Sequence, residues 1–174
     1  MKKGNILLML GTIGIISFAT AAQAGIFSTS AQDFVTKASI AGQFEIQSSK
    51  LAVQKSQNDD VKDFAQRMID DHTAADDQLK NAVASSNTNL QISEDLDSKH
   101  QKLIAKLNSL TGVDFDKKYV SLQIKAHEKA VHLFRGYAKQ NDAPALNTFA
   151  KKTLPTLQDH LTHAKQLKDT MGGK

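Results

Sequence analysis

The stretch VKDFAQRMIDDHTAADDQLKNAVA (residues 61–84) decides the fold of this chain. Its apolar and small residues recur at alternating spacings of four and three, which is the period of a helix that buries one face. This stripe consists of Val61, Ala65, Met68, His72, Ala75, Leu79 and Ala82. Asn58, Asp59 and Asp60 come just before it and supply a capping side chain and the acidic charge that favours a helix start. The stretch therefore predicts a helix with a histidine on its buried face.

Three further long helices are predicted by the same period, over residues 30–56, 113–140 and 142–171. A shorter helix is expected after Ser93, with Gly112 as its stop, and serves as a connector packed on the others. Pro155 lies within the last long helix and should bend it, because proline lacks the backbone donor and crowds the preceding turn. The sequence thus predicts an all-α protein.

An internal repeat relates the two halves of the chain. The pairs Asp71–His72 and Asp159–His160 are each followed, at the same offset, by the sequence QLK. The first two long helices therefore look like a distant copy of the last two. Two similar helical hairpins packed face to face make a four-helix bundle, here with one short connecting helix.

The first 24 residues have the three parts of a secretory signal peptide. The basic start MKKGN is followed by the apolar run ILLMLGTIGIISFA and by TAAQA, which places small residues at the cleavage positions. This run of 14 residues is shorter than the about 20 that a membrane-spanning helix needs. We expect cleavage after Ala24 and a periplasmic or secreted protein with no membrane span, in which a short lead-in (25–30) precedes one bundle domain (31–171).

Composition excludes several classes of function. The formal net charge of +4 falls to +2 when Lys2 and Lys3 leave with the signal peptide. Such a small positive charge does not indicate binding to nucleic acid. There is no cysteine, so neither disulfides nor a lipidated cysteine are expected. No nucleophile with its base, phosphate loop or nucleotide fingerprint is present. We therefore do not expect an enzyme, and the sequence names no protein partner in the cell envelope.

One group of ionisable residues lies near the midpoints of the four long helices. Because the midpoints of packed helices share a layer, these side chains should face one another. The group comprises Glu45, His72, His127 or Glu128, and His160. A buried charge or imidazole is costly without a partner. Carboxylate and imidazole together are the ligands of iron, manganese or zinc in bundle cores, so we consider a transition-metal site.

A second interpretation of the same residues stays open. Buried histidines are usually satisfied by hydrogen bonds, so the cluster can equally be a polar network without metal. The protein would then be a non-catalytic structural or stress-related envelope protein that acts through its surface.

Three segments carry a resemblance to a known family, namely FAQRMIDDHTAADDQLK (64–80), AHEKAVHLF (126–134) and FAKKTLPTLQDHLTHAKQLK (149–168). They resemble domain-of-unknown-function family 4142, whose members are exported bacterial proteins grouped with the ferritin-like bundles. The resemblance implies a ferritin-like fold and an exported protein, and it implies no reaction. The Glu-x-x-His pattern of di-iron ferritins is missing, because Ile69 and Leu157 stand three residues before His72 and His160. We therefore expect at most a single ion rather than a di-iron centre.

Overall fold

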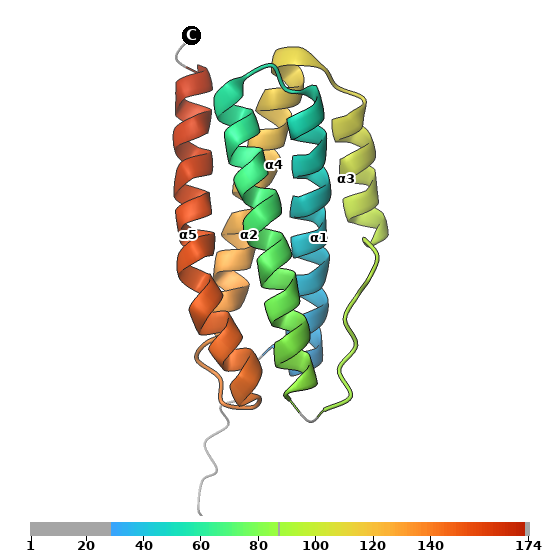
Figure 1. Cartoon of the computed structure of the whole chain (residues 1–174), viewed down its shortest axis with the longest axis vertical. Coiled ribbons are helices and arrows are strands. Elements are labelled where there is room, and N and C mark those ends of the chain that lie inside the picture. The colour runs from blue at the N-terminus through green and yellow to red at the C-terminus, as the bar shows by residue number, and fades with distance from the viewer. Residues whose placement is uncertain (1–28, 87, 173–174) are drawn as a thin grey trace, which may run out of the picture.

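The computed structural model describes residues 29–86 and 88–172, which contain five helices and no strand. The four long helices lie side by side and the short one lies outside them (Figure 1). Their bounds are Ala31–Lys55 (α1), Asp59–Ala84 (α2), Ser98–Asn108 (α3), Gly112–Tyr137 (α4) and Pro144–Gly172 (α5). The all-α prediction is confirmed, whereas the predicted signal peptide, residues 1–24, lies outside the described residues.

The four long helices form two antiparallel hairpins. α1 packs mainly on α2, and α4 packs mainly on α5, while α1 also contacts α4 and α2 contacts α5. A long connection that contains α3 runs back along the bundle, so that α4 starts at the same end as α2 (Figure 1). One such crossover is the connectivity of ferritin-like bundles. Among the described residues, no helix combines the length and the apolar character needed to cross a membrane.

The helix starts follow the capping side chains. Ser30 accepts a hydrogen bond from the backbone of Asp33. Asn58 accepts two from the first turn of α2, as the sequence predicts. The start of α3 differs from the prediction. It begins at Ser98 because the side chain of Asp97 caps the backbone N–H of His100, and the residues between Ser93 and Asp97 are not helical.

The connection from α3 to α4 also differs from the prediction. α3 ends at Asn108, so Gly112 does not stop it but is the first residue of α4. Gly112 has a φ of +56°, in the left-handed region that glycine adopts without strain. At the other end, α4 stops at Tyr137 rather than Gln140. Pro155 lies inside α5 without ending it.

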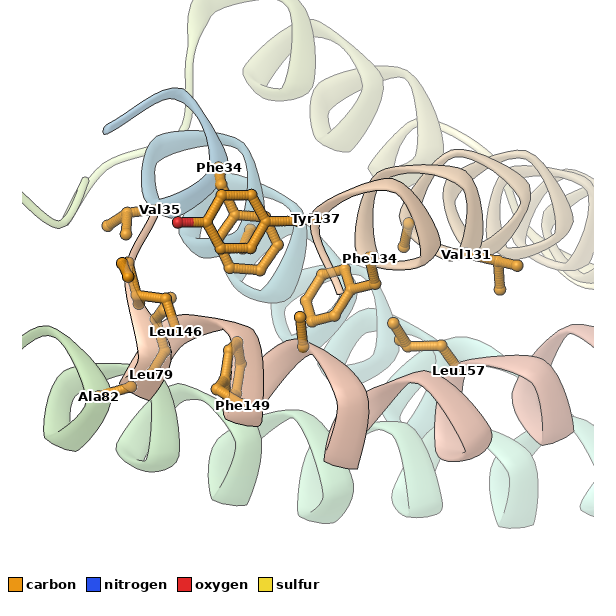
Figure 2. Close-up of a cluster of buried hydrophobic side chains, with 14 residues drawn as sticks. Phe34, Val35, Leu79, Ala82, Val131, Phe134, Tyr137, Leu146, Phe149 and Leu157 are labelled. Atoms are coloured by element: carbon orange, nitrogen blue, oxygen red, sulfur yellow. The ribbon is translucent and has the colours of Figure 1, made fainter. Parts of the chain in front are cut away.

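Two apolar clusters fill the bundle, one in each half. The first includes Phe34, whose ring stacks on that of Tyr137 with centroids 4.0 Å apart (Figure 2). The second includes Phe64, Phe115 and Tyr119. Each long helix contributes to both clusters. In α2, α4 and α5 a buried histidine lies between the two contributions, and in α1 the buried Glu45 directly follows Phe44. The core is therefore divided by a polar layer at mid-height.

Candidate metal centre

The polar layer brings together one side chain from each long helix. Glu45 on α1, His72 on α2, His127 on α4 and His160 on α5 are exposed by 1%, 5%, 0% and 1%. One ring nitrogen from each of the three histidines lies within 4.8 Å of the corresponding nitrogens of the other two. The layer expected from the midpoints of the helices is thus present, and its members come from four separate helices.

Glu45 approaches two of the histidines without bonding to either. Its Oε2 lies 3.1 Å from Nε2 of His72, and its Oε1 lies 3.3 Å from Nδ1 of His127. Neither contact has the direction of a hydrogen bond, and both Glu45 Oε1 and His72 Nε2 lack any hydrogen-bond partner in the protein. Unpaired buried polar atoms are costly, so this corner of the layer is suited to a further group.

The outer nitrogens of His127 and His160 are both held by acceptors. Nδ1 of His127 lies 2.9 Å from the backbone oxygen of Gln123, and Nε2 of His160 lies 2.7 Å from Oδ2 of Asp71. Because a carbonyl and a carboxylate only accept, these two ring nitrogens must carry the protons. In the neutral rings the lone pairs are then on Nε2 of His127 and Nδ1 of His160, which face each other at 3.3 Å. Two lone pairs at that distance repel each other, and a cation between them would turn the repulsion into attraction.

Asp71 borders the layer and contacts His160, which the sequence pattern does not predict. It follows from the helical turn: adjacent residues point about 100° apart, so Asp71 faces α5 while His72 faces the bundle centre. Its Oδ2 also lies 3.4 Å from Nε of Arg67. A carboxylate on the outer nitrogen of a histidine is the usual support of a metal-bound imidazole, because it fixes both ring orientation and tautomer.

Glu128 does not join the layer. Its side chain is 52% exposed, and its Oε1 lies 3.5 Å from Nζ of Lys165. The physical reason is again the turn of the helix, because α4 can direct only one of two adjacent residues to the bundle centre, and that residue is His127. Of the five candidate residues, the structure therefore brings four together. His132 is exposed, and the ring of His163 packs against that of Phe64 in a T-shaped arrangement.

Further polar residues hold the layer from one side. Gln123, whose backbone oxygen orients His127, is itself fully buried and donates from its side chain to Oγ of Ser48. The Ser48 hydroxyl in turn donates to the backbone oxygen of Glu45. These bonds tie α4 to α1 beside the layer and restrict the positions that Glu45 and His127 can take.

Burial sets the protonation states in this layer. It raises the pKa of Glu45 from 4.5 to about 8 and lowers the pKa of His127 from 6.5 to about 4. The pKa of His72 falls well below its usual value through burial and through the neighbouring His127 and His160. Burial also lowers the pKa of His160, although Asp71 opposes the shift. Without a cation, the layer therefore favours a protonated Glu45 and neutral imidazoles.

This donor set fits a transition-metal ion. Three imidazoles and one carboxylate are ligands that iron, manganese and zinc accept, and neutral imidazole is the form that binds metal. An ion between the three histidines would satisfy Nε2 of His72 and the facing lone pairs of His127 and His160. Glu45 lies outside this group of three, with its Oε2 beside Nε2 of His72. A di-iron centre does not fit, because Glu45 is the single carboxylate among the four members of the layer.

Comparison with known proteins gives a fold and a family. The "putative secreted protein DUF305" of Streptomyces coelicolor is similar in structure, with a TM-score of 0.67, 14% identity, and coverage of 80% of this chain and 90% of that one. A DUF305 fragment from Deinococcus radiodurans is also similar, with a TM-score of 0.68, 14% identity, and coverage of 85% of this chain and 100% of that one. Identity this low supports the fold alone, and no curated protein matches. The family model "Domain of unknown function (DUF4142)" matches residues 17–167, and the chain belongs to this family.

Proposed function

We propose that this protein is an exported helical bundle that binds one divalent transition-metal ion, iron, manganese or zinc. Its ligands are Glu45, His72, His127 and His160. One observation carries the proposal: Nε2 of His127 faces Nδ1 of His160 at 3.3 Å, while the outer nitrogen of each ring is occupied by an acceptor. This arrangement of two oriented imidazoles is the arrangement by which proteins prepare histidines for a metal.

The alternative to a metal is a proton between His127 and His160. The resulting imidazolium would pair with Asp71 and give the polar network that the sequence also allows. A proton satisfies only that pair of nitrogens, however, and leaves Glu45 Oε1 and His72 Nε2 without partners. A divalent ion satisfies the whole layer, and its charge favours the deprotonated form of Glu45 that burial opposes. The unpaired atoms therefore favour the metal.

The bound ion would link all four long helices at mid-height. Ion binding to the folded chain alone stabilises the fold in proportion to the logarithm of the free ion concentration. When bound, the ion supplies Lewis acidity and, if it is iron or manganese, the capacity to change oxidation state. We propose capture of the ion, without a reaction, as the role of this layer.

We further propose that the chain is exported with cleavage after Ala24, which leaves Gly25 first and the bundle at 31–171 as a single domain. The tripartite N-terminal sequence supports this, as does the description of a structural neighbour as secreted. Intact-mass measurement of the exported protein tests the claim. A species that retains Met1 would contradict it.

Elemental analysis of protein purified without an affinity tag tests the metal proposal. We expect one ion per chain in the wild type and its loss in Glu45→Gln and His127→Gln. Glu128→Gln is the matched control, because Glu128 adjoins His127 in the sequence but is exposed. Substoichiometric metal after incubation with iron(II), manganese(II) and zinc(II) would contradict the proposal, as would retention of the ion in both layer variants.

A further inference from the structure

A small cavity borders one side of the polar layer. Its volume is about 30 Å³, and its lining includes Glu45 and His72 but neither His127 nor His160. A cavity of this size exceeds the about 10–15 Å³ that one water molecule requires. The cavity exists because several of its lining residues have small side chains or none, namely Ala38, Ala41, Gly42, Ala75 and Ala130. A Cβ atom added to Gly42 would meet no atom within 4 Å.

Three of the residues that line this cavity each carry a buried polar atom without a hydrogen-bond partner. These atoms are Glu45 Oε1, His72 Nε2 and Thr153 Oγ1. Thr153 is 8% exposed and lies on α5, two turns before His160. Threonine hydroxyls within helices often bond to the carbonyl one turn earlier, as Thr162 does with Gln158. The hydroxyl of Thr153 makes no such bond and is free to donate.

Charge indicates which kind of molecule this cavity suits. A divalent ion with the carboxylate of Glu45 and three neutral imidazoles carries one net positive charge in a buried layer. Asp71 offsets little of it, because its carboxylate is shared with Arg67. Most of the remaining cavity wall is apolar, with Leu79, Phe134, Phe149 and Leu157. A monoanion would neutralise this charge in mainly apolar surroundings, where an uncompensated charge is costly.

We propose that this cavity is the binding site of a small monoanion of one to three atoms, which coordinates the metal and accepts a hydrogen bond from Thr153. This inference rests on the proposed function, because the anion needs the ion. Glu45 and His72 are the two ligands that border the cavity, so the ion's accessible side is the side that faces Thr153. Thr153 is a positioning residue for the anion and not a ligand of the ion.

The partly exposed side chain of Asp76 marks where this cavity reaches the surface. Its carboxylate lines the cavity, is 20% exposed, and pairs with Nζ of Lys80 at 2.9 Å. This contact reduces the acidic charge of Asp76 at the opening, although Nζ of Lys80 also lies 3.5 Å from the more exposed Asp77. The cavity thus connects the polar layer with solvent past small side chains.

Azide binding to the cobalt(II)-loaded mature protein tests the inference. The visible spectrum of cobalt(II) reports a change of coordination, so metal loading and azide binding are measured in one sample. We expect azide to change the wild-type spectrum in a saturable manner. Thr153→Val keeps the shape but removes the hydroxyl, and should weaken azide binding about three- to tenfold, the value of one hydrogen bond, with cobalt affinity unchanged. Thr153→Ser should restore it.

Filling the cavity gives a second, independent test. Gly42→Val directs methyl groups into the space beside Glu45 and should abolish azide binding while cobalt remains bound. If Gly42→Val does not fold, Gly42→Ala should give a partial loss. Cobalt binding without any effect of azide overturns the inference alone, as does azide binding that none of the Thr153 and Gly42 variants alters. A wild-type protein that binds no cobalt overturns the proposed function and this inference together.

Discussion

Nε2 of His127 lies 3.3 Å from Nδ1 of His160, and the opposite nitrogen of each ring already bonds to an acceptor. His127 lies on α4 and His160 on α5, so the relationship exists only when these two helices pack against each other. Because of this contact, Nε2 of His127 and Nδ1 of His160 can both donate to one ion placed between them.

Removal of the charge on Asp71 should weaken metal binding. Asp71→Asn keeps an oxygen that can accept from His160 but loses the negative charge that makes the imidazole a better donor. Loss of such a supporting carboxylate typically lowers metal affinity about 10- to 100-fold. Competition with a chelator measures this. Asp70→Asn is the matched control, because Asp70 is exposed and its side chain accepts a hydrogen bond from Gln66. Equal effects of the two variants would contradict the role of Asp71.

Metal affinity should depend on pH through Glu45. Its pKa of about 8 in the metal-free protein means that the ion must displace a proton below that pH. Affinity should therefore fall about tenfold for each pH unit below 8. The histidines add little in this range because burial lowers their pKa values. Titrations of the wild-type protein at pH 6, 7 and 8 measure the slope. A pH-independent wild-type affinity would refute the prediction.

Stability of the metal-free protein should pass through a maximum near pH 6.5. Below this pH the unfolded chain binds protons at its histidines that the folded chain, with lowered histidine pKa values, does not, so stability is lost as pH falls toward about 4. Above this pH, Glu45 is the member of the layer whose protonation differs between the folded and the unfolded chain. Its raised pKa means that the folded chain retains a proton that the unfolded chain has released, so stability falls as pH rises toward about 8.

Between pH 6.5 and 8, the change in the free energy of unfolding reports on the protonation of Glu45. Over that interval one retained proton corresponds to about 2 kcal/mol, an order-of-magnitude value. Urea unfolding in the presence of a chelator measures it. In Glu45→Gln the decline between pH 6.5 and 8 should disappear while the acid side remains. A wild-type stability that rises steadily from pH 6 to 8 would show that Glu45 is not buried as described.

The bundle could be predicted because its residues repeat with the helical period. His72 and His160 stand in unbroken apolar stripes, so their burial follows from spacing alone. The choice between His127 and Glu128 could not be made in this way. α4 carries two adjoining stripes, and the rotation of α4 against its neighbours decides which of two adjacent residues faces inward. That rotation depends on packing among all four helices and not on the local sequence.

The internal repeat also did not predict which of its paired residues belong to the site. In the repeat Glu45 corresponds to Glu128, because each lies 13 residues before an asparagine, Asn58 and Asn141. Yet Glu45 is buried, and Glu128 pairs with Lys165 at the surface. Likewise Asp71 bonds across to His160, whereas the corresponding Asp159 is exposed. The two hairpins have diverged in which side of each helix carries charge. A site built from both hairpins is therefore asymmetric, and only contacts between helices reveal it.

The most direct test of the account is anomalous diffraction from crystals of the zinc-loaded protein, recorded on both sides of the zinc absorption edge. We predict one strong anomalous peak per chain, about 2.1 Å from a nitrogen of each of His72, His127 and His160, with a Glu45 oxygen in contact. Crystals of His127→Gln should lack this peak. Anomalous peaks confined to surface groups such as the Asp97–His100 pair, with none between the three buried histidines, would contradict the central claim.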